Sequence, residues 1–176
     1  MDKRKLIVVS LSWLLVIVSM VMISYFSMED GEKSSNTSDK IVDAVIETLP
    51  NKDQITSQQR TKISFSVRKL AHFGIYMLLG FTLINAVKNS FPIKSYFQIL
   101  ISLGTSVLYA IFDEFFVQAK SSGRAPQWTD VAIDTSGAII GIFLFITILF
   151  VYDQIQLKNN QKKGISKSWD SFYFVK

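Results

Sequence analysis

The chain contains no cysteine, a single histidine, three prolines and eight glycines in 176 residues. The absence of cysteine excludes disulfide bonds, thiolate nucleophiles and cysteine-ligated metal sites. Charged residues make up only 19% of the chain, against 49% hydrophobic and 13% aromatic residues. So little charge beside so many apolar residues disfavours a soluble globular domain and indicates a membrane protein.

Four apolar runs are long enough to cross a membrane. The hydrocarbon core of a bilayer is about 30 Å thick, and about 20 helical residues span it. Because only helices and closed barrels satisfy their backbone polar groups in lipid, the runs predict an all-α polytopic membrane protein with four transmembrane helices. They extend from about Leu6 to Phe26, Leu70 to Val87, Phe97 to Val117 and Val131 to Tyr152.

The basic residues near the ends of these runs predict the orientation, because short cytoplasmic loops are rich in lysine and arginine. The first run is longer than a signal-peptide core and lacks a small-residue cleavage site, so we interpret it as an uncleaved anchor. Both termini are expected in the cytoplasm, and the net charge of +5 then reflects membrane orientation and not a nucleic-acid partner. Basic residues that agree are Lys3, Arg4, Lys5, Lys88, Lys94, Lys158, Lys162, Lys163 and Lys167, whereas Arg68, Lys69, Lys120 and Arg124 would lie outside.

The predicted organisation has four parts. Residues 1–26 form a signal-anchor helix, and residues 27–66 form an extracytoplasmic linker with a short amphipathic helix. Residues 67–152 form a three-helix core, followed by a basic cytoplasmic tail at 153–176. The amphipathic helix would rest on lipid headgroups or act as a lid; from Thr56 to Ser66 the helical pattern can continue into the second span. Its apolar face consists of Ile41, Val42, Val45, Ile46 and Leu49.

Three of the predicted helices deliver polar residues to one membrane face. In an up-and-down arrangement the start of the second span, the end of the third and the start of the fourth share one side. Residues four apart also share a helix face. Charged groups at the edge of lipid are costly, so their gathering indicates a functional site. The candidate ligand-binding residues are Arg68, Lys69, His72, Tyr76, Asp113, Glu114, Gln118, Arg124, Asp130 and Asp134.

These residues allow three interpretations. The first is an ion-pair network that only holds the helices together. The second is a recognition pocket in which Arg68, Lys69 and Arg124 hold the phosphate of a membrane headgroup. The third is catalysis: a divalent cation such as Mg²⁺ or Mn²⁺ held by carboxylates would activate water against a phosphoester or pyrophosphate bond. Candidate catalytic residues are His72, Asp113, Glu114 and Asp134.

The fourth run also carries a packing motif. Gly137 and Gly141 form a small-xxx-small pattern, which lets helices approach closely in lipid. Asp134 lies on roughly the same face. We therefore expect Asp134 to point inward, towards another helix.

Two stretches of the sequence resemble the signatures of the VanZ-like family of bacterial membrane proteins. Arg68-Lys69-Leu70-Ala71-His72-Phe73-Gly74-Ile75-Tyr76 with Leu79-Gly80 resembles the first signature. Asp113-Glu114, Gly123-Arg124, Asp130, Asp134-Thr135, Gly137-Ala138 and Gly141 resemble the second. The resemblance covers about Arg68 to Gly141.

The chain departs from the family pattern at three places. The family usually has a His-Gln pair soon after Asp-Glu, whereas this chain reads Phe115-Phe116-Val117-Gln118, and the stretch from Glu114 to Gln118 is one residue longer. Ser122 replaces the usual proline before Gly-Arg, and Ile75 occupies a place that is often acidic.

The founding member of the family is associated with low-level resistance to the glycopeptide teicoplanin, so the resemblance implies a multi-pass protein of the bacterial cell membrane. The leading hypothesis is a non-enzymatic protein that binds or shields a membrane lipid or lipid-linked cell-wall precursor and lowers teicoplanin susceptibility. The alternatives are a metal-dependent hydrolase or transferase acting on a polyprenyl-phosphate-type headgroup, and an accessory subunit of a wall-synthesis protein.

Overall fold

The fold is a bundle of long helices. The computed structural model describes residues 2–28, 41–44, 46–47, 55–120 and 126–162. These ranges contain no strand, and four helices are long and apolar enough to cross a membrane, which confirms the predicted fold class. The elements are α1 (Lys3–Ser27), α3 (Ser57–Ser90), α4 (Ser95–Phe112), the π-helix η2 (Asp113–Val117), the short 3₁₀-helix η3 (Gln118–Lys120) and α5 (Trp128–Lys162).

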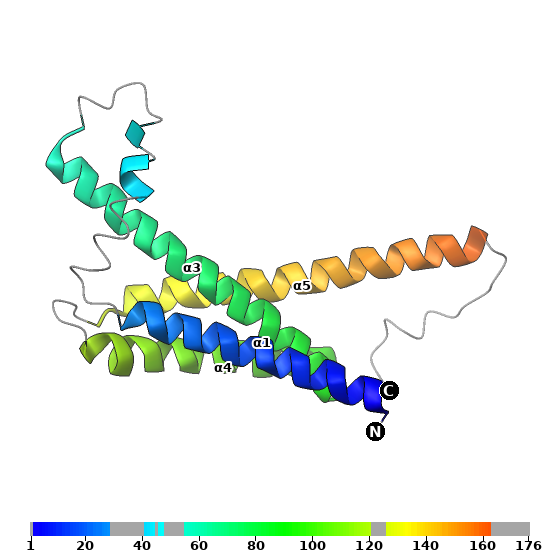
Figure 1. The fold of residues 1–176 in the computed structure, drawn as a ribbon. Helices are drawn as coiled ribbons and strands as arrows, with labels where there is room; N and C mark the ends of the chain where they lie inside the picture. The colour runs from blue at the N-terminus through cyan, green and yellow to red at the C-terminus, as the bar shows by residue number, and fades with distance from the viewer. Residues whose placement is uncertain (1, 29–40, 45, 48–54, 121–125, 163–176) are drawn as a thin grey trace.

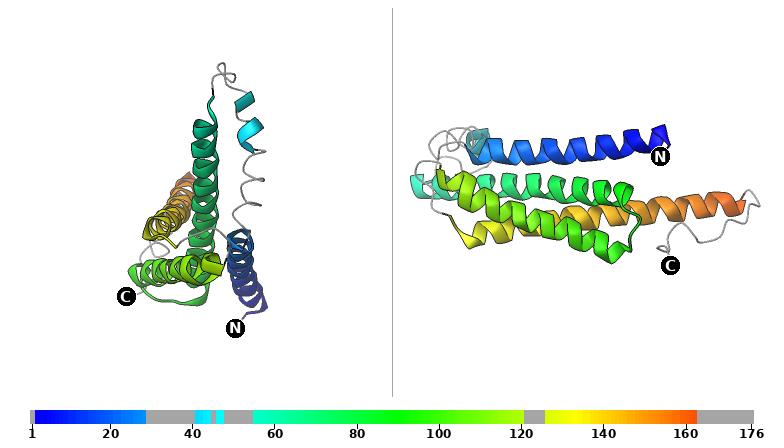
Figure 2. Two further views of the ribbon diagram at one scale, coloured as in Figure 1. Left: turned by 90° about the vertical axis from the view of Figure 1, so that its left-hand side faces the viewer. Right: turned by 90° about the horizontal axis from the view of Figure 1, so that it is seen from below.

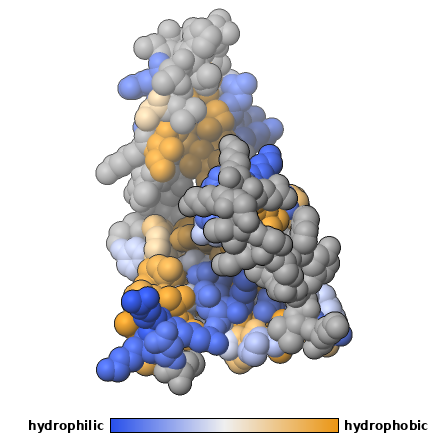
Figure 3. Space-filling model, turned by 90° about the vertical axis from the view of Figure 1, so that its right-hand side faces the viewer, coloured by the Kyte–Doolittle hydropathy of each residue, from blue (hydrophilic) through white to orange (hydrophobic). Residues whose placement is uncertain are grey.

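The helices alternate in direction, as expected from the sequence. In Figure 1, α1 and α4 end on the left, where α3 and α5 begin. We call this the site end of the bundle. The connectivity therefore brings the polar residues of α3, η2 and α5 to the same end. Hydrophilic residues also gather at the opposite end, which carries the N-terminus (Figure 3).

Helix α3 is the centre of the bundle, since it packs against α1, α4 and α5 (Figure 2). Its inner face holds the fully buried Tyr76, Leu79 and Leu83, which pack with Val16 of α1 and other core residues. The outer faces carry large apolar side chains that a lipid bilayer would cover, as expected for membrane-spanning helices. Examples are Leu14, Leu108 and Phe143, which are 54%, 70% and 67% exposed.

Helices α3 and α5 touch through their backbones. A side-chain carbon added at Gly137 would overlap the carbonyl oxygen of Phe73, and one added at Gly141 would overlap that of Met77. A carbon added at Gly80 would likewise overlap the carbonyl oxygen of Ala138. The close helix approach predicted from the small-xxx-small pattern is therefore confirmed.

Helix α1 is joined to α3 by hydrogen bonds near the end opposite the site. Ser12 Oγ accepts from the side-chain amides of Asn85, at 3.1 Å, and Asn89, at 3.3 Å. Trp13 Nε1 donates to Ser90 Oγ at 2.9 Å. Polar side chains commonly join helices in lipid in this way. The first helix is thus a packed part of the bundle.

Two helices extend beyond the predicted apolar runs. Helix α3 begins at Ser57, where a capping box between Thr56 and Gln59 satisfies its first turn. Helix α5 continues to Lys162, into the predicted tail. With 34 and 35 residues they are about 51 and 52 Å long, which exceeds the hydrocarbon core because polar helical turns continue past the lipid.

The predicted amphipathic helix is partly described. Residues 41–44 and 46–47 are helical, with Val42 buried and Ile41 half exposed. An ion pair of 2.7 Å joins Asp43 to Arg60 at the start of α3. Val45 and Leu49, which the prediction placed on the same face, lie outside the described residues.

Candidate functional site

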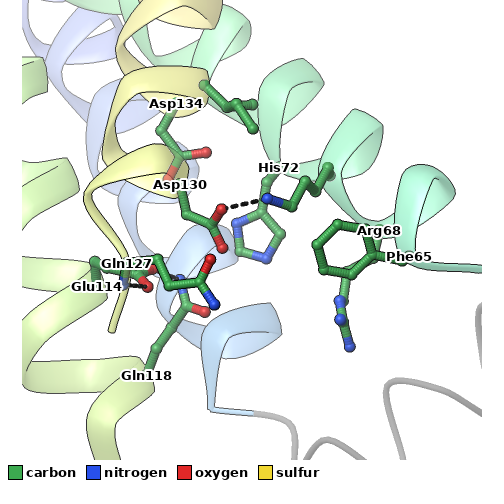
Figure 4. Close-up of a pocket in the computed structure, with 10 residues that line it drawn as sticks. Phe65, Arg68, His72, Glu114, Gln118, Gln127, Asp130 and Asp134 are labelled. Carbon is green, nitrogen blue, oxygen red and sulfur yellow. Dashed lines mark hydrogen bonds and ion pairs between the residues drawn. The ribbon is translucent and has the colours of Figure 1, made fainter. Parts of the chain in front are cut away.

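A polar pocket of about 150 Å³ opens at the site end, between the first half of α3, η2 and the start of α5 (Figure 4). That volume is several times what one water molecule needs, so the pocket can hold a small polar group. Its lining consists of Phe65, Arg68, Lys69, His72, Glu114, Gln118, Gln127, Asp130, Ile133 and Asp134.

Helix α3 supplies the basic side of the pocket. Phe65, Lys69 and His72 recur at helical spacing, so they lie on one face together with Arg68. The Arg68 guanidinium carbon and the Lys69 ammonium nitrogen lie 5.5 Å and 4.5 Å from the centre of the Phe65 ring. Cations within about 6 Å of an aromatic ring are attracted to its face. The exposed Phe65 ring therefore helps to hold both cations at this side of the pocket.

An ion pair joins α3 to α5 across the pocket. Lys69 Nζ donates to Asp130 Oδ1 at 2.6 Å, and the two side chains are 23% and 30% exposed. Asp130 also lies in the first turn of α5, where a carboxylate is favoured by the helix dipole. Part of the cluster thus holds the helices together.

The third span changes from an α-helix to a π-helix at the site. In η2 the backbone amide of Gln118 donates to the carbonyl oxygen of Asp113, five residues back. This wider turn takes one more residue than an α-turn. The widened turn also lets Asp113 and Glu114, at 0% and 2% exposure, both face the interior. Single π-turns inside α-helices are frequent at functional sites.

The Glu114 carboxylate is fully engaged by protein donors. Gln118 Nε2 donates to Oε2 at 2.6 Å, and the backbone amide of Gln127 donates to Oε1 at 2.8 Å. Gln127 immediately precedes α5, so Glu114 satisfies an amide at the start of that helix. This role of Gln127 was not predicted, because a backbone donor leaves no sequence signal.

Asp113 is held by a residue of α1. Ser27 Oγ donates to Asp113 Oδ2 at 2.5 Å, and Gln118 Nε2 lies 3.4 Å from the same oxygen. The sequence interpretation missed Ser27, although a signal exists. Ser12, Ser19 and Ser27 recur with helical periodicity on α1 and are all buried, as small polar residues at a helix interface are expected to be.

Asp134 is the buried acid on the pocket wall. It is 2% exposed, as the prediction of an inward-facing side chain required. It interacts electrostatically with Asp113, Glu114 and Asp130. Within the described part of the chain, its Oδ2 atom has no hydrogen-bond partner, and neither has the hydroxyl of the buried Tyr76. A buried acceptor without a donor is costly, so Asp134 marks a position where a ligand group would be favoured.

The predicted site residues divide into three groups. Asp113 and Tyr76 are buried beside the pocket and do not line it. Arg124 lies outside the described residues, so its predicted role is not placed. The residues that line the pocket together are Arg68, Lys69, His72, Glu114, Gln118, Asp130 and Asp134.

The carboxylates of the described residues are not grouped as ligands of a metal ion. Among the described residues, no group of three or more histidine and acidic side chains could hold a metal ion. Both Glu114 oxygens accept hydrogen bonds from protein donors, and Asp130 accepts one from Lys69. Glu114 and Asp130 therefore fit a divalent cation poorly, because their oxygens are turned towards protein donors.

Comparison with known proteins identifies one family. The model of the VanZ/LLP1 family matches residues 12–151, which includes most of α1 and most of α5. The match begins at Ser12, the first buried position of α1, and extends well beyond the region that carries the sequence resemblance. No curated protein and no solved structure matches the chain.

Proposed function

Since the chain belongs to the VanZ/LLP1 family and is a multi-pass membrane protein by its four apolar helices, we propose that it binds the phosphate of a lipid-linked component of the bacterial cell envelope. By holding or shielding this component it would lower susceptibility to teicoplanin. The observation that carries the proposal is the polar pocket with Arg68 at its side, at one end of a lipid-facing bundle.

Arg68 is the cation best placed to hold the phosphate. Lys69 is neutralised by Asp130, whereas no carboxylate in the described ranges lies within ion-pair distance of Arg68. Its guanidinium points away from Asp134, as Figure 4 shows. An arginine fork matches two phosphate oxygens at once. The phosphate would therefore lie at the side of the pocket formed by α3.

The depth of the pocket also suits a headgroup. The stretch of α3 from Leu70 to Ser90 is about 31 Å long, which matches the hydrocarbon core. Arg68 and Phe65 then lie just outside the hydrocarbon, at the level of lipid phosphates. The pocket would therefore hold the phosphate region of a lipid-linked component at the membrane surface.

A binding experiment with a matched control tests the proposal. Farnesyl phosphate, a dispersible polyprenyl phosphate, is titrated into the detergent-purified chain. We expect saturable binding that is at least about tenfold weaker in Arg68→Gln, since a hydrogen bond to a charged group contributes about 1.5–3 kcal/mol. Arg60→Gln is the control, because Arg60 is exposed on the same helix and pairs with Asp43 away from the pocket. Absence of saturable binding, or equal loss in both variants, contradicts the proposal.

The proposal needs the site end to face outward, with both termini in the cytoplasm. The chain lacks cysteine, so single cysteines introduced at Ser35, Ser122, Ser90 and Asn160 can be labelled in intact cells with a membrane-impermeant thiol reagent. We expect labelling at Ser35 and Ser122 only. Labelling only at Ser90 and Asn160 would place the pocket in the cytoplasm and overturn direct shielding of wall precursors.

A second candidate function is hydrolysis or group transfer on a polyprenyl-phosphate-type headgroup. It is favoured by His72, which lies inside the pocket between the basic and acidic sides (Figure 4). The arrangement of the carboxylates fits the required divalent cation poorly, so this candidate has less support. Metal-stimulated phosphate release that is lost in Asp113→Asn and His72→Ala would favour it over binding alone. A wall-synthesis enzyme that copurifies with the chain would instead indicate an accessory subunit.

A further inference from the structure

We infer that the pocket selects a zwitterionic headgroup, with a primary ammonium group on Asp134 and the phosphate beside Arg68. The inference rests on the proposed function, since it assigns the second half of the ligand in the same pocket. The ligand class is a phosphodiester that carries a short aminoalkyl group. A bare phosphate and a quaternary ammonium headgroup would both bind less well.

The two sides of the pocket differ in charge. Its basic side is formed by Arg68, beside Phe65, and its acidic side by Asp134 and Glu114. Lys69 and Asp130 neutralise each other at 2.6 Å. With Asp134 and Glu114 ionised, the acidic side carries more negative charge than Arg68 alone offsets. A ligand with a single negative charge would bring its phosphate to Arg68 and leave this acidic side without a cation.

Asp134 is the position where the cation would bind. Its side chain is 2% exposed, it lines the pocket, and its Oδ2 atom has no hydrogen-bond partner among the described residues. Three donors of the pocket are engaged elsewhere: Gln118 Nε2 and the Gln127 amide donate to Glu114, and Lys69 donates to Asp130. The buried Tyr76 hydroxyl makes no hydrogen bond to Asp134 Oδ2 either. An ammonium group that enters the pocket would supply the missing donor.

Charge and size both favour a primary ammonium group. An N–H donor that carries a positive charge satisfies the hydrogen bond and neutralises Asp134, and such bonds are about twice as strong as neutral ones. A hydroxyl would supply the hydrogen bond alone. A trimethylammonium group would supply the charge without a donor, and it is bulkier in a pocket of about 150 Å³.

Short-chain phospholipids test the inference without any substitution. Dihexanoyl lipids with ethanolamine, choline, glycerol or no headgroup alcohol are titrated into the full chain in detergent, and bound lipid is counted by native mass spectrometry. We expect the ethanolamine lipid to bind at least about tenfold more tightly than the choline lipid, as one charged hydrogen bond predicts. Equal binding of these two lipids, or tighter binding of the glycerol lipid, overturns the inference.

Variants separate this inference from the proposed function. Asp134→Asn should remove the preference for ethanolamine and keep binding of the lipids through their phosphate. Arg68→Gln should weaken binding of every lipid. Retention of the full ethanolamine preference in Asp134→Asn contradicts the assignment of Asp134 while phosphate binding stands. If neither farnesyl phosphate nor any short-chain lipid binds the wild-type chain, the proposed function fails together with the inference.

Discussion

A methyl group added at Gly141 would overlap the carbonyl oxygen of Met77 and lie 2.9 Å from the amide nitrogen of Phe81. Packed heavy atoms normally stand about 3.5–4.0 Å apart, so α3 and α5 would have to separate. Backbone atoms cannot rotate aside as a side chain can, which places the cost near the upper end of the about 1–3 kcal/mol typical of overpacking. Alanine returns about 1 kcal/mol of helix propensity over glycine. We expect Gly141→Ala to lower the free energy of unfolding by about 2 kcal/mol.

The assay is equilibrium unfolding in mixed micelles with increasing sodium dodecyl sulfate, followed by tryptophan fluorescence. Gly104 and Gly74 provide matched controls, because an added carbon at either position meets nothing within 4 Å. Both alanine variants should be as stable as the wild type or slightly more stable, by the helix propensity alone. If Gly141→Ala unfolds at the same detergent fraction as Gly104→Ala, the helices do not pack through their backbones and the reasoning is refuted.

Two further predictions concern the hydrogen bonds around the pocket. Lys69→Met should lower the free energy of unfolding by about 2 kcal/mol in the same assay, between the values for exposed and buried ion pairs. The double variant that exchanges Lys69 and Asp130 should recover part of this loss. If the effects of the two single changes simply add in the double variant, the ion pair does not contribute. Ser27→Ala should lower the free energy of unfolding by about 2 kcal/mol, because it removes a hydrogen bond to the buried carboxylate of Asp113. The exposed Ser10 on the same helix is the control, and an equal effect of Ser10→Ala would contradict this assignment.

The helices and their common polar face could be predicted from the sequence, because both depend on features of short stretches of the chain. The length of an apolar run decides whether it can span a bilayer. Alternating spans then decide which helix ends meet. Arg68 and Asp130 were placed at one end by this reasoning alone, and the structure brings them to one pocket. The small-xxx-small pattern likewise predicted the inward position of Asp134 from spacing along a single helix.

The partners of the buried acids could not be predicted in the same way. The spacing of Ser27 with Ser12 and Ser19 indicates that it faces a neighbouring helix, but it lies 86 residues from Asp113 and nothing in the sequence identifies that partner. The amide that satisfies Glu114 belongs to the backbone of Gln127, where any residue except proline would supply it. The π-helix at Asp113–Val117 was not predicted either, because nothing in the local sequence distinguished it from a continued α-helix. Tyr76 shares its helix face with Arg68, yet it lies about two helical turns further along α3, where that face is part of the core.

The contact of Gly137 and Gly141 with α3 also affects the pocket at the site end of the bundle. Helices α3 and α5 cross in Figure 1, and their tight backbone contact at Gly137 and Gly141 would act as a pivot for the angle between them. Asp130 precedes Gly137 by about 10 Å of helix, so a change of about 10° in the crossing angle moves it by about 2 Å relative to the pivot. The width of the pocket is therefore determined by residues that touch no ligand. Substitutions at the pivot would alter headgroup binding even where every side chain in the pocket is unchanged.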